Sequence, residues 1–246
     1  MPDVVRQGWL LAGNDRELGM IEPEGPLVDV LPAKRPAAVT LTGRYCRVEA
    51  LDPDRHGDDL WAALRQDASL WSYMAYGPFQ DQRAFAEWLG TRAALADPIS
   101  YAVVDADDEA AAGIVTLMEV RPEMRVIEIG NIVLGPRLQR TRAATEAHYL
   151  MARYAFETLG YRRYEWKCNA QNGPSRRAAL RLGFAFEGIF RQHMIVKGRN
   201  RDTAWYAMLD CDWPARKQAL ESWLAPENFD RAGRQRNSLA SFAGPA

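Results

Sequence analysis

The order of the elements that the sequence predicts indicates a mixed α/β (α+β) domain. Two observations predict this fold class. The spacing of apolar residues changes along the chain between alternation, which is typical of strands, and a helical repeat. Strands cluster as sequence neighbours joined by short polar turns, except for one strand–helix–strand crossover near the centre. Such an order is typical of a sheet with flanking helices rather than of a helical bundle.

The composition indicates an ordinary globular protein. The chain has 246 residues, of which 48% are hydrophobic and 26% charged, enough for one substantial domain or two small ones. The formal net charge is -1, so the sequence lacks the basic excess typical of nucleic-acid-binding proteins. We therefore expect no nucleic-acid partner.

The cysteines and the N-terminus favour a reducing, cytoplasmic location. Cys46, Cys168 and Cys211 are odd in number and far apart, which indicates neither a disulfide framework nor a zinc site. Residues 1–11 lack the pattern of a secretory signal, and no run is apolar enough to span a membrane.

The first half of the chain contains an irregular arm, then a strand, two helices and three strands. Prolines and glycines punctuate residues 1–40, which predicts an irregular arm. The spacing of apolar residues predicts a strand over 44–50, a helix from Pro53, a helix over 81–96, and strands over 100–104, 111–120 and 126–134. The last of these is almost wholly apolar, as expected for a strand covered on both faces.

The second half begins with a long helix after Gly135-Pro136 that ends at Gly160. A strand over 163–168, a helix from Pro174 to Gly183 and two strands over 184–196 and 203–209 follow, the last two joined by a polar turn over 198–202. An amphipathic helix then runs to about Leu224, before a polar tail whose composition allows disorder.

The segment from Ile132 to Ala144 joins a buried strand to the long helix through a short turn. The first turn of a helix offers unpaired N–H groups and the positive end of the helix dipole, which suit a phosphate. Arg137, Arg140 and Arg142 add positive charge there. Arginines at a helix start also form solvated faces, so the residues alone leave both interpretations open.

A second strand-to-helix segment, from Asn172 to Phe184, carries a specific resemblance. Its Leu-Gly-Phe ending, preceded by Asn172 and Ser175, resembles the last characteristic block of the GNAT superfamily of N-acetyltransferases. Within it, the block is similar to the branch that includes the ribosomal-protein alanine N-acetyltransferases. The run 139–144 falls where the superfamily has its pyrophosphate loop, and Glu128-Ile-Gly130 where the branch often has Glu-Ile-Gly.

The resemblance covers about residues 41–211. It implies a mixed, mostly antiparallel central sheet with splayed central strands and flanking helices. It also implies an enzyme that uses acetyl-CoA as cosubstrate, needs no metal and acetylates a primary amine. We accordingly divide the chain into the arm (1–40), an acetyltransferase domain (41–212) and a C-terminal helix with a polar tail (213–246). Homodimers are common among similar proteins, although no residue here requires one, and no membrane partner is expected.

Two positions depart from the family pattern. Arg142 stands where the pyrophosphate loop has its middle glycine, so its side chain must point away from the phosphates or contact them itself. Ala179 stands where many relatives have a tyrosine that protonates the departing thiolate. The resemblance therefore offers Ser175 as the acid.

The reaction needs few catalytic groups because a neutral amine attacks a thioester directly and no covalent enzyme intermediate forms. Placing the two reactants together supplies much of the rate enhancement. Backbone N–H groups at the splayed strand end can hold the thioester oxygen. Glu128 is the best-placed base for the proton of the amine. The candidate catalytic residues are Glu128 and Ser175, and the candidate acetyl-CoA-binding residues are Asn131, Ile132, Val133, Leu134, Gln139, Arg140, Thr141, Arg142, Ala143, Ala144 and Asn172.

Several alternatives stay open. Glu128 has an equally plausible structural role, with Glu119 as the substitute base, and Asn172 suits both a helix cap and a contact with pantetheine. His193 is a candidate for the acceptor site. The aromatic residues Trp71, Tyr73, Tyr76 and Phe79 suit either core packing or the acceptor pocket. The acceptor is a protein N-terminus, a lysine or a small amine. The rival to an enzyme is a non-catalytic acyl-CoA-binding module, and nucleotide binding is disfavoured because the GxxxxGK[ST] motif is absent.

Overall fold

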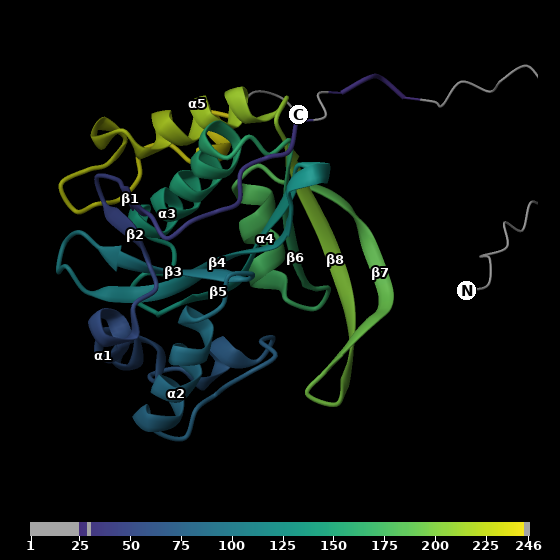
Figure 1. The fold of residues 1–246 in the computed structure, drawn as a ribbon. Coiled ribbons are helices and arrows are strands. Elements are labelled where there is room, and N and C mark those ends of the chain that lie inside the picture. The colour runs from purple at the N-terminus through teal and green to yellow at the C-terminus, as the bar shows by residue number, and fades with distance from the viewer. Residues whose placement is uncertain (1–24, 29–30, 244–246) are drawn as a thin grey trace, which may run out of the picture. The chain divides into compact units, whose positions relative to one another are not determined.

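The structure, a computed structural model, describes residues 25–28 and 31–243. Most of the predicted N-terminal arm therefore lies outside the described residues. The fold described below is that of the compact unit that begins at Leu31 (Figure 1).

One eight-stranded sheet forms the centre of this unit. All neighbouring strands are antiparallel except β5 and β6, which are parallel and joined by the predicted crossover. In spatial order the strands are β1 (Thr40–Thr42), β2 (Cys46–Ala50), β3 (Ile99–Asp105), β4 (Ala111–Arg121), β5 (Val126–Leu134), β6 (Arg163–Asn169), β8 (Arg199–Leu209) and β7 (Ala185–Val196). The predicted fold class is confirmed.

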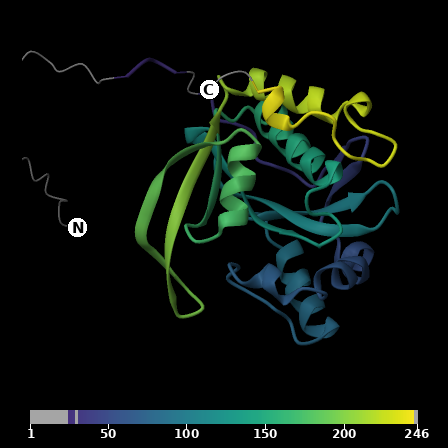
Figure 2. The same ribbon diagram turned by 180° about the vertical axis from the view of Figure 1, so that it is seen from behind.

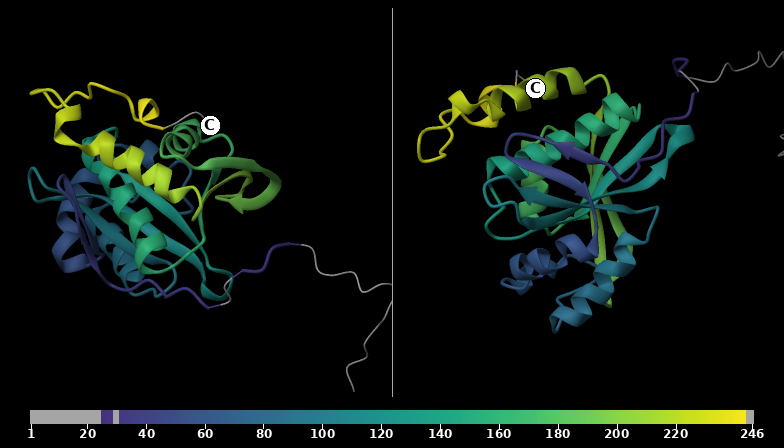
Figure 3. Two further views of the ribbon diagram at one scale, coloured as in Figure 1. Left: turned by 90° about the horizontal axis from the view of Figure 1, so that it is seen from above. Right: turned by 60° about the vertical axis from the view of Figure 1, so that its left-hand side comes forward.

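Helices cover both faces of the sheet. The five are α1 (Pro53–Leu64), α2 (Gln82–Ala93), α3 (Arg142–Arg153), α4 (Gly173–Arg181) and α5 (Trp213–Leu224). Helices α1 and α2 lie on one face, and α3, α4 and α5 lie on the other, as the view along the sheet in Figure 3 shows. Both faces of the central strands are therefore buried, which explains the apolar run in β5.

Side-chain caps define where four of these helices begin. Asp52, Asp81, Thr141 and Asn172 each accept a hydrogen bond from a backbone N–H group in the first turn of the helix that follows. Such caps satisfy N–H groups that have no partner within the helix. Thr141 and Asn172 thereby fix the starts of α3 and α4, the two helices that follow the splayed strands.

The buried carboxylate of Glu146 ties α3 to the turn between β1 and β2. It accepts hydrogen bonds from the backbone N–H groups of Arg44, Tyr45 and Cys46 at 2.8, 2.6 and 2.9 Å. Gly43 passes so close that a Cβ there would overlap the Glu146 carboxyl group. These contacts hold the N-terminal half of α3 in place on the sheet.

Three details differ from the sequence predictions. Strand β1 was not among the predicted elements, because it has only three residues and lies at the sheet edge. The last hairpin turns at Lys197 and Gly198, whose φ values of 49° and 71° are typical of a tight hairpin turn, so the polar residues 199–202 belong to β8. A five-residue π-helix, Tyr154–Thr158, continues α3.

The described part of the polar tail packs on the domain through specific contacts, whereas its composition allows a disordered segment. Asn228 is buried and donates to the carbonyl oxygens of Trp223 and Asn237. The N–H group of Asn237 donates in return to the Asn228 amide oxygen. Leu239 is buried in the core. Figure 2 shows this yellow segment lying over the helices of one face.

Candidate active site

The central feature of the site is the divergence of β5 and β6. The two strands pair only from Val126–Ile129 to Arg163–Trp166. Beyond those pairs, the last residues of β5 have no strand partner on the β6 side. On its other side, β5 pairs Gly130 with Thr116 and Val133 with Ile114, so Asn131 and Ile132 both lie opposite Val115. This is a β-bulge, a feature that is common next to active sites.

Residues 131–133, whose backbone N–H groups are the candidates for binding the thioester oxygen, lie at this bulge. Asn131 has a φ of 48°, and its side-chain amide donates to the sulfur of Met118 at 3.6 Å. Because the β6-side edge of residues 131–134 has no strand partner, its backbone N–H groups are available to a ligand in the gap. Such donors suit a developing oxyanion.

Helix α3 begins at Arg142, and the turn residues 135–141 separate it from the end of β5, so the helix starts later than the prediction after Gly135-Pro136. Thr141 accepts from the N–H group of Ala144 at 3.1 Å, and the side chain of Gln139 donates to the carbonyl oxygen of Leu134 at 2.9 Å. The N–H groups of Arg142 and Ala143 are in the first turn of α3 and have no partner within the helix. Donors of this kind at a helix start suit a phosphate.

The three arginines near this helix start have different surroundings. Arg142 lies over the rings of Tyr45 and Phe229, at 4.4 and 5.7 Å from their centroids. Arg137 forms an ion pair with Asp108. Arg140 is exposed, with a φ of 62°, and within residues 31–243 its side chain has no ion-pair partner. The guanidinium group of Arg142 therefore packs on rings from the turn between β1 and β2 and from the tail.

Glu128 lies on the face of the sheet covered by α1 and α2. Side chains alternate along a strand, and Trp166 of β6 packs against His148 of α3, so its neighbours Glu165 and Lys167 point to the opposite face. Glu128 Oε2 is 2.9 Å from Lys167 Nζ. Burial raises the pKa of Glu128 to about 7, although the positive charge of Lys167 opposes this rise. A carboxyl group with this pKa can exchange protons near neutral pH.

The alternative base, Glu119, lies on the neighbouring strand β4. It is exposed and has a φ of 50°, in an irregular part of the β4–β5 ladder. Its carboxylate is therefore open to water, whereas Glu128 is buried in the sheet. Glu128 is therefore the stronger candidate.

Ser175 and Asn172 lie on the opposite face of the sheet, at the start of α4. The Asn172 amide oxygen accepts from the N–H group of Ser175 at 3.1 Å, which establishes the capping interpretation of Asn172. The Ser175 hydroxyl oxygen accepts from the indole N–H group of Trp166 at 3.0 Å. Since the indole can only donate, Ser175 keeps its own proton to donate, and the Cys168 thiol is one group within its reach.

The segment between α1 and α2 is held by the β7–β8 hairpin and by the loop before α4. Lys197, in the hairpin turn, donates to the carbonyl oxygens of Trp71, Tyr76 and Gly77 at 3.0, 3.2 and 2.6 Å. The Tyr73 hydroxyl donates to the carbonyl oxygen of Gln171 at 3.1 Å. These contacts tie the α1–α2 segment to both the hairpin and the loop before α4.

The predicted aromatic cluster divides between core and surface. Trp71, Tyr76 and Phe79 pack against one another and against Trp88, which favours the core interpretation for these rings. Tyr73 is 37% exposed. His193 is exposed on β7, where its ring contacts Phe190 and Trp205 and its Nδ1 lies 3.0 Å from the Thr203 hydroxyl.

Sequence reasoning missed the partners of Glu128. Lys167 lies between Glu128 and Glu165 and over the ring of Trp205. The signal was the alternation in β6, which places Arg163, Glu165 and Lys167 on one face. That signal shows a charged face but not which strand supplies the opposing carboxylate.

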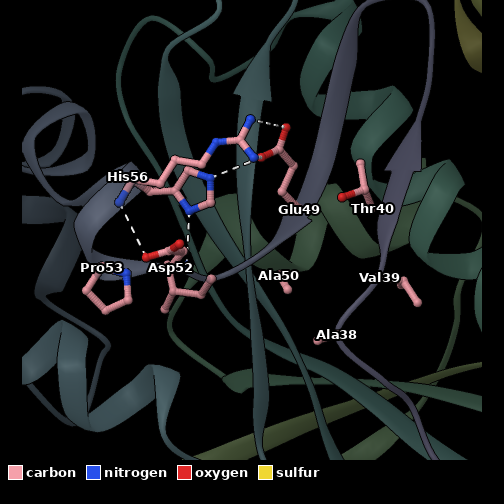
Figure 4. Close-up of a pocket in the computed structure, with 10 residues that line it drawn as sticks. Ala38, Val39, Thr40, Glu49, Ala50, Asp52, Pro53 and His56 are labelled. Atoms are coloured by element: carbon pink, nitrogen blue, oxygen red, sulfur yellow. Dashed lines mark hydrogen bonds and ion pairs between the residues drawn. The ribbon is translucent and has the colours of Figure 1, made fainter.

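A pocket at the start of α1 contains a second charged cluster, away from the splayed strands (Figure 4). Glu49 forms ion pairs there with Arg47 and Arg55, and its Oε2 lies 3.2 Å from His56 Nε2, within hydrogen-bond distance. His56 Nδ1 accepts from the N–H group of Asp52 at 3.1 Å. Each of these polar groups is satisfied by the others, so the cluster is a structural link between β2 and α1.

Comparisons with known proteins agree with this geometry. Residues 48–185 match the acetyltransferase (GNAT) domain family. A GCN5-related N-acetyltransferase from Brucella melitensis is 49% identical, with a TM-score of 0.85 over 87% of this chain and 97% of that one. The Bacillus subtilis protein "Uncharacterized N-acetyltransferase YnaD" is 27% identical over 62% of this chain and 89% of its own length.

The chain belongs to the GNAT family of acetyltransferases. It is thus an acetyl-CoA-dependent acyltransferase. The fold also matches that of RimL, a ribosomal L7/L12 α-N-protein acetyltransferase solved in complex with coenzyme A, with 18% identity and a TM-score of 0.60 over 70% of this chain and 98% of that one. At that identity the likeness concerns the fold alone.

Two further findings bear on partners. Among the described residues, no helix has the length and apolar character needed to cross a membrane. Within residues 25–28 and 31–243, no three His, Cys, Asp or Glu side chains are grouped as a metal site would require.

Proposed function

We propose that this GNAT protein transfers the acetyl group of acetyl-CoA to a primary amine by direct attack in a ternary complex. The observation that carries the proposal is the buried Glu128 carboxyl group, with a pKa of about 7, beside the bulged and unpaired edge of β5. A base of this pKa can accept the proton of an attacking amine near neutral pH.

The donor and the acceptor approach the gap from opposite faces of the sheet. The N–H groups at the start of α3 bind the pyrophosphate of acetyl-CoA, and the edge of residues 131–134 holds the pantetheine arm and the thioester oxygen. Asn172 contacts the pantetheine arm in addition to capping α4. Ser175 lies on this donor face and Glu128 on the α1–α2 face, so the thioester lies between the proposed acid and the proposed base.

The bonds and protons balance with these two groups and solvent. The amine nitrogen attacks the carbonyl carbon, forming the C–N bond, and the collapsing intermediate breaks the C–S bond. Glu128 accepts the proton of the amine and later releases it to solvent. The Ser175 hydroxyl donates a proton to the departing sulfur and regains one from solvent.

The proposal is tested by measuring the release of the CoA thiol with a panel of acceptors. The panel contains a peptide with a free N-terminus and no lysine, a lysine peptide with a blocked N-terminus, a polyamine and a free amino acid. Mass spectrometry of the products identifies the acetylated nitrogen. We expect saturable transfer to one of these classes, which also identifies the acceptor.

The control compares two glutamates on adjacent strands. Glu128→Gln should lower kcat by about 10²–10⁴-fold without changing the affinity for acetyl-CoA, whereas Glu119→Gln should stay within a few-fold of wild type. Tight binding of acetyl-CoA without transfer to any amine would instead identify a non-catalytic acyl-CoA-binding protein.

A further inference from the structure

Lys167 lies between two buried carboxylates. Its Nζ is 2.9 Å from Glu128 Oε2 and 3.1 Å from Glu165 Oε2, and its side chain is only 11% exposed. The ammonium group also lies 4.1 Å from the ring centroid of Trp205, which is directly opposite Lys167 in the β6–β8 ladder. Contacts on three sides fix the position of this ammonium group.

Two arginines fix the carboxylate of Glu165 in addition to Lys167. Arg121 of β4 and Arg163 of β6 contact its carboxylate at 2.8 and 2.7 Å. Burial alone would raise the pKa of Glu165, but the hydrogen bond from Arg163 and the charge of Lys167 bring it below its ordinary value. Glu165 is therefore a fixed negative charge at neutral pH, and it anchors Lys167 beside Glu128.

The two oxygens of Glu128 have different surroundings. Lys167 occupies Oε2. Oε1 faces Gly130, where a Cβ would lie 3.2 Å from it, and Gly130 directly precedes the bulge at Asn131. In the described part of the chain, Oε1 has no hydrogen-bond or ion-pair partner. One oxygen is thus held by Lys167, and the other lies beside Gly130, next to the bulge in β5.

We propose that Lys167 is a positioning residue, which holds Oε2 so that Oε1 meets the acceptor amine and whose charge favours the carboxylate form of Glu128. This inference rests on the proposed role of Glu128 as the base. The ionisable groups that face Glu128 are Lys167 and Glu165 from β6 and Glu119 from β4. Lys167 is the single cation among these three neighbours, so its removal leaves only negative charges beside a buried carboxyl group.

The charge arrangement predicts shifts of opposite sign for two variants. An opposite charge this close lowers the pKa of a carboxyl group by about one to three units, so Lys167→Met should raise the pKa of Glu128 by about that amount. Removing the neighbouring negative charge in Glu165→Gln should lower it. Lys167→Arg keeps the charge and should largely restore the wild-type value. A general loss of packing cannot produce shifts of opposite sign.

The experiment is an NMR titration of the protein labelled with ¹³C at the glutamate side-chain carboxyl carbons. The Glu128 signal is assigned by its absence in Glu128→Gln. Lys217→Met is the matched control, because Lys217 forms an ion pair with Glu157 beside α5 and should leave the Glu128 titration unchanged. Circular dichroism confirms that each variant is folded.

Kinetics supply the second readout. With one acceptor throughout, the acid limb of the kcat–pH profile should move upward by about one to three pH units in Lys167→Met and downward in Glu165→Gln. The acceptor's own ionisation is the same in every variant, so it does not contribute to the difference.

The outcomes separate the inference from the proposed function. A Glu128 titration that stays at the wild-type midpoint in both Lys167→Met and Glu165→Gln would overturn the inference alone. Shifted titrations in a protein whose Glu128→Gln variant transfers acetyl at the wild-type rate would overturn the base role of Glu128, and the positioning role of Lys167 with it. Shifts in both the titration and the kcat profile would support the inference.

Discussion

Replacing Glu146 by alanine tests how α3 is held on the sheet. The Glu146 carboxylate is 6% exposed and accepts three backbone hydrogen bonds from the turn between β1 and β2. No other acceptor for these N–H groups occurs in the described part of the chain. Glu146→Ala therefore leaves three donors unpaired, and it loosens the first turns of the helix that we assign to the pyrophosphate.

The expected loss follows from the burial of each donor. A buried N–H group left unpaired costs about 1–3 kcal/mol. Tyr45 and Cys46 are buried, whereas Arg44 is exposed and water can solvate its N–H group. Two full penalties and a small third predict a decrease of about 2–6 kcal/mol in the free energy of unfolding. For a domain of this size, that decrease lowers Tm by roughly 4–24 °C.

Urea denaturation and differential scanning calorimetry at pH 7 measure this loss. Glu87→Ala is the matched control, because Glu87 is 67% exposed and pairs with Arg83 on the surface of α2, where we expect less than about 1 kcal/mol. A loss below about 1 kcal/mol in Glu146→Ala would show that water satisfies the three N–H groups and that Glu146 does not hold α3 as we infer.

Four further predictions concern Gly43 beside Glu146 and three residues of the candidate site. Gly43→Ala should lower the free energy of unfolding by about 1–3 kcal/mol in urea denaturation, because its Cβ would overlap the Glu146 carboxyl group. Ser175→Ala should lower kcat about ten-fold or more while calorimetry finds acetyl-CoA affinity unchanged. Lys197→Met should raise the KM for the amine about ten-fold, because it frees the hairpin from the α1–α2 segment. Since burial raises the pKa of Glu128 to about 7, kcat should fall as the pH drops below about 7, and Glu128→Gln should lack this limb.

The elements that the sequence predicted well have strong local signals. The apolar run of β5 ends at Gly135-Pro136, and the structure places the strand at the predicted residues, Val126–Leu134. Strand β1 has no such signal, because three residues are too few to show a period. The packing of the tail depends on the buried side chain of Asn228. From composition alone, a buried asparagine cannot be distinguished from one that is exposed to water.

The sequence predicted those parts of the candidate site that lie close together in one segment. The bulged edge and the capped helix start lie within the single run from residue 130 to residue 144. The position of the Arg142 side chain depends instead on Phe229, far along the chain in the tail. The ion pair of Glu128 with Lys167 likewise depends on the register of two parallel strands, which one sequence does not determine.

Calorimetric titration with acetyl-CoA is the most direct test of the donor site at the start of α3. We expect one saturable site with a Kd at or below tens of micromolar, roughly the range useful to a working enzyme. Arg140→Glu, which places a negative charge near the start of α3, should weaken binding by roughly five- to thirty-fold, whereas Arg137→Glu should have a smaller effect because Arg137 is already paired with Asp108. Absence of saturable binding up to about millimolar acetyl-CoA would show that this chain has no functional donor site.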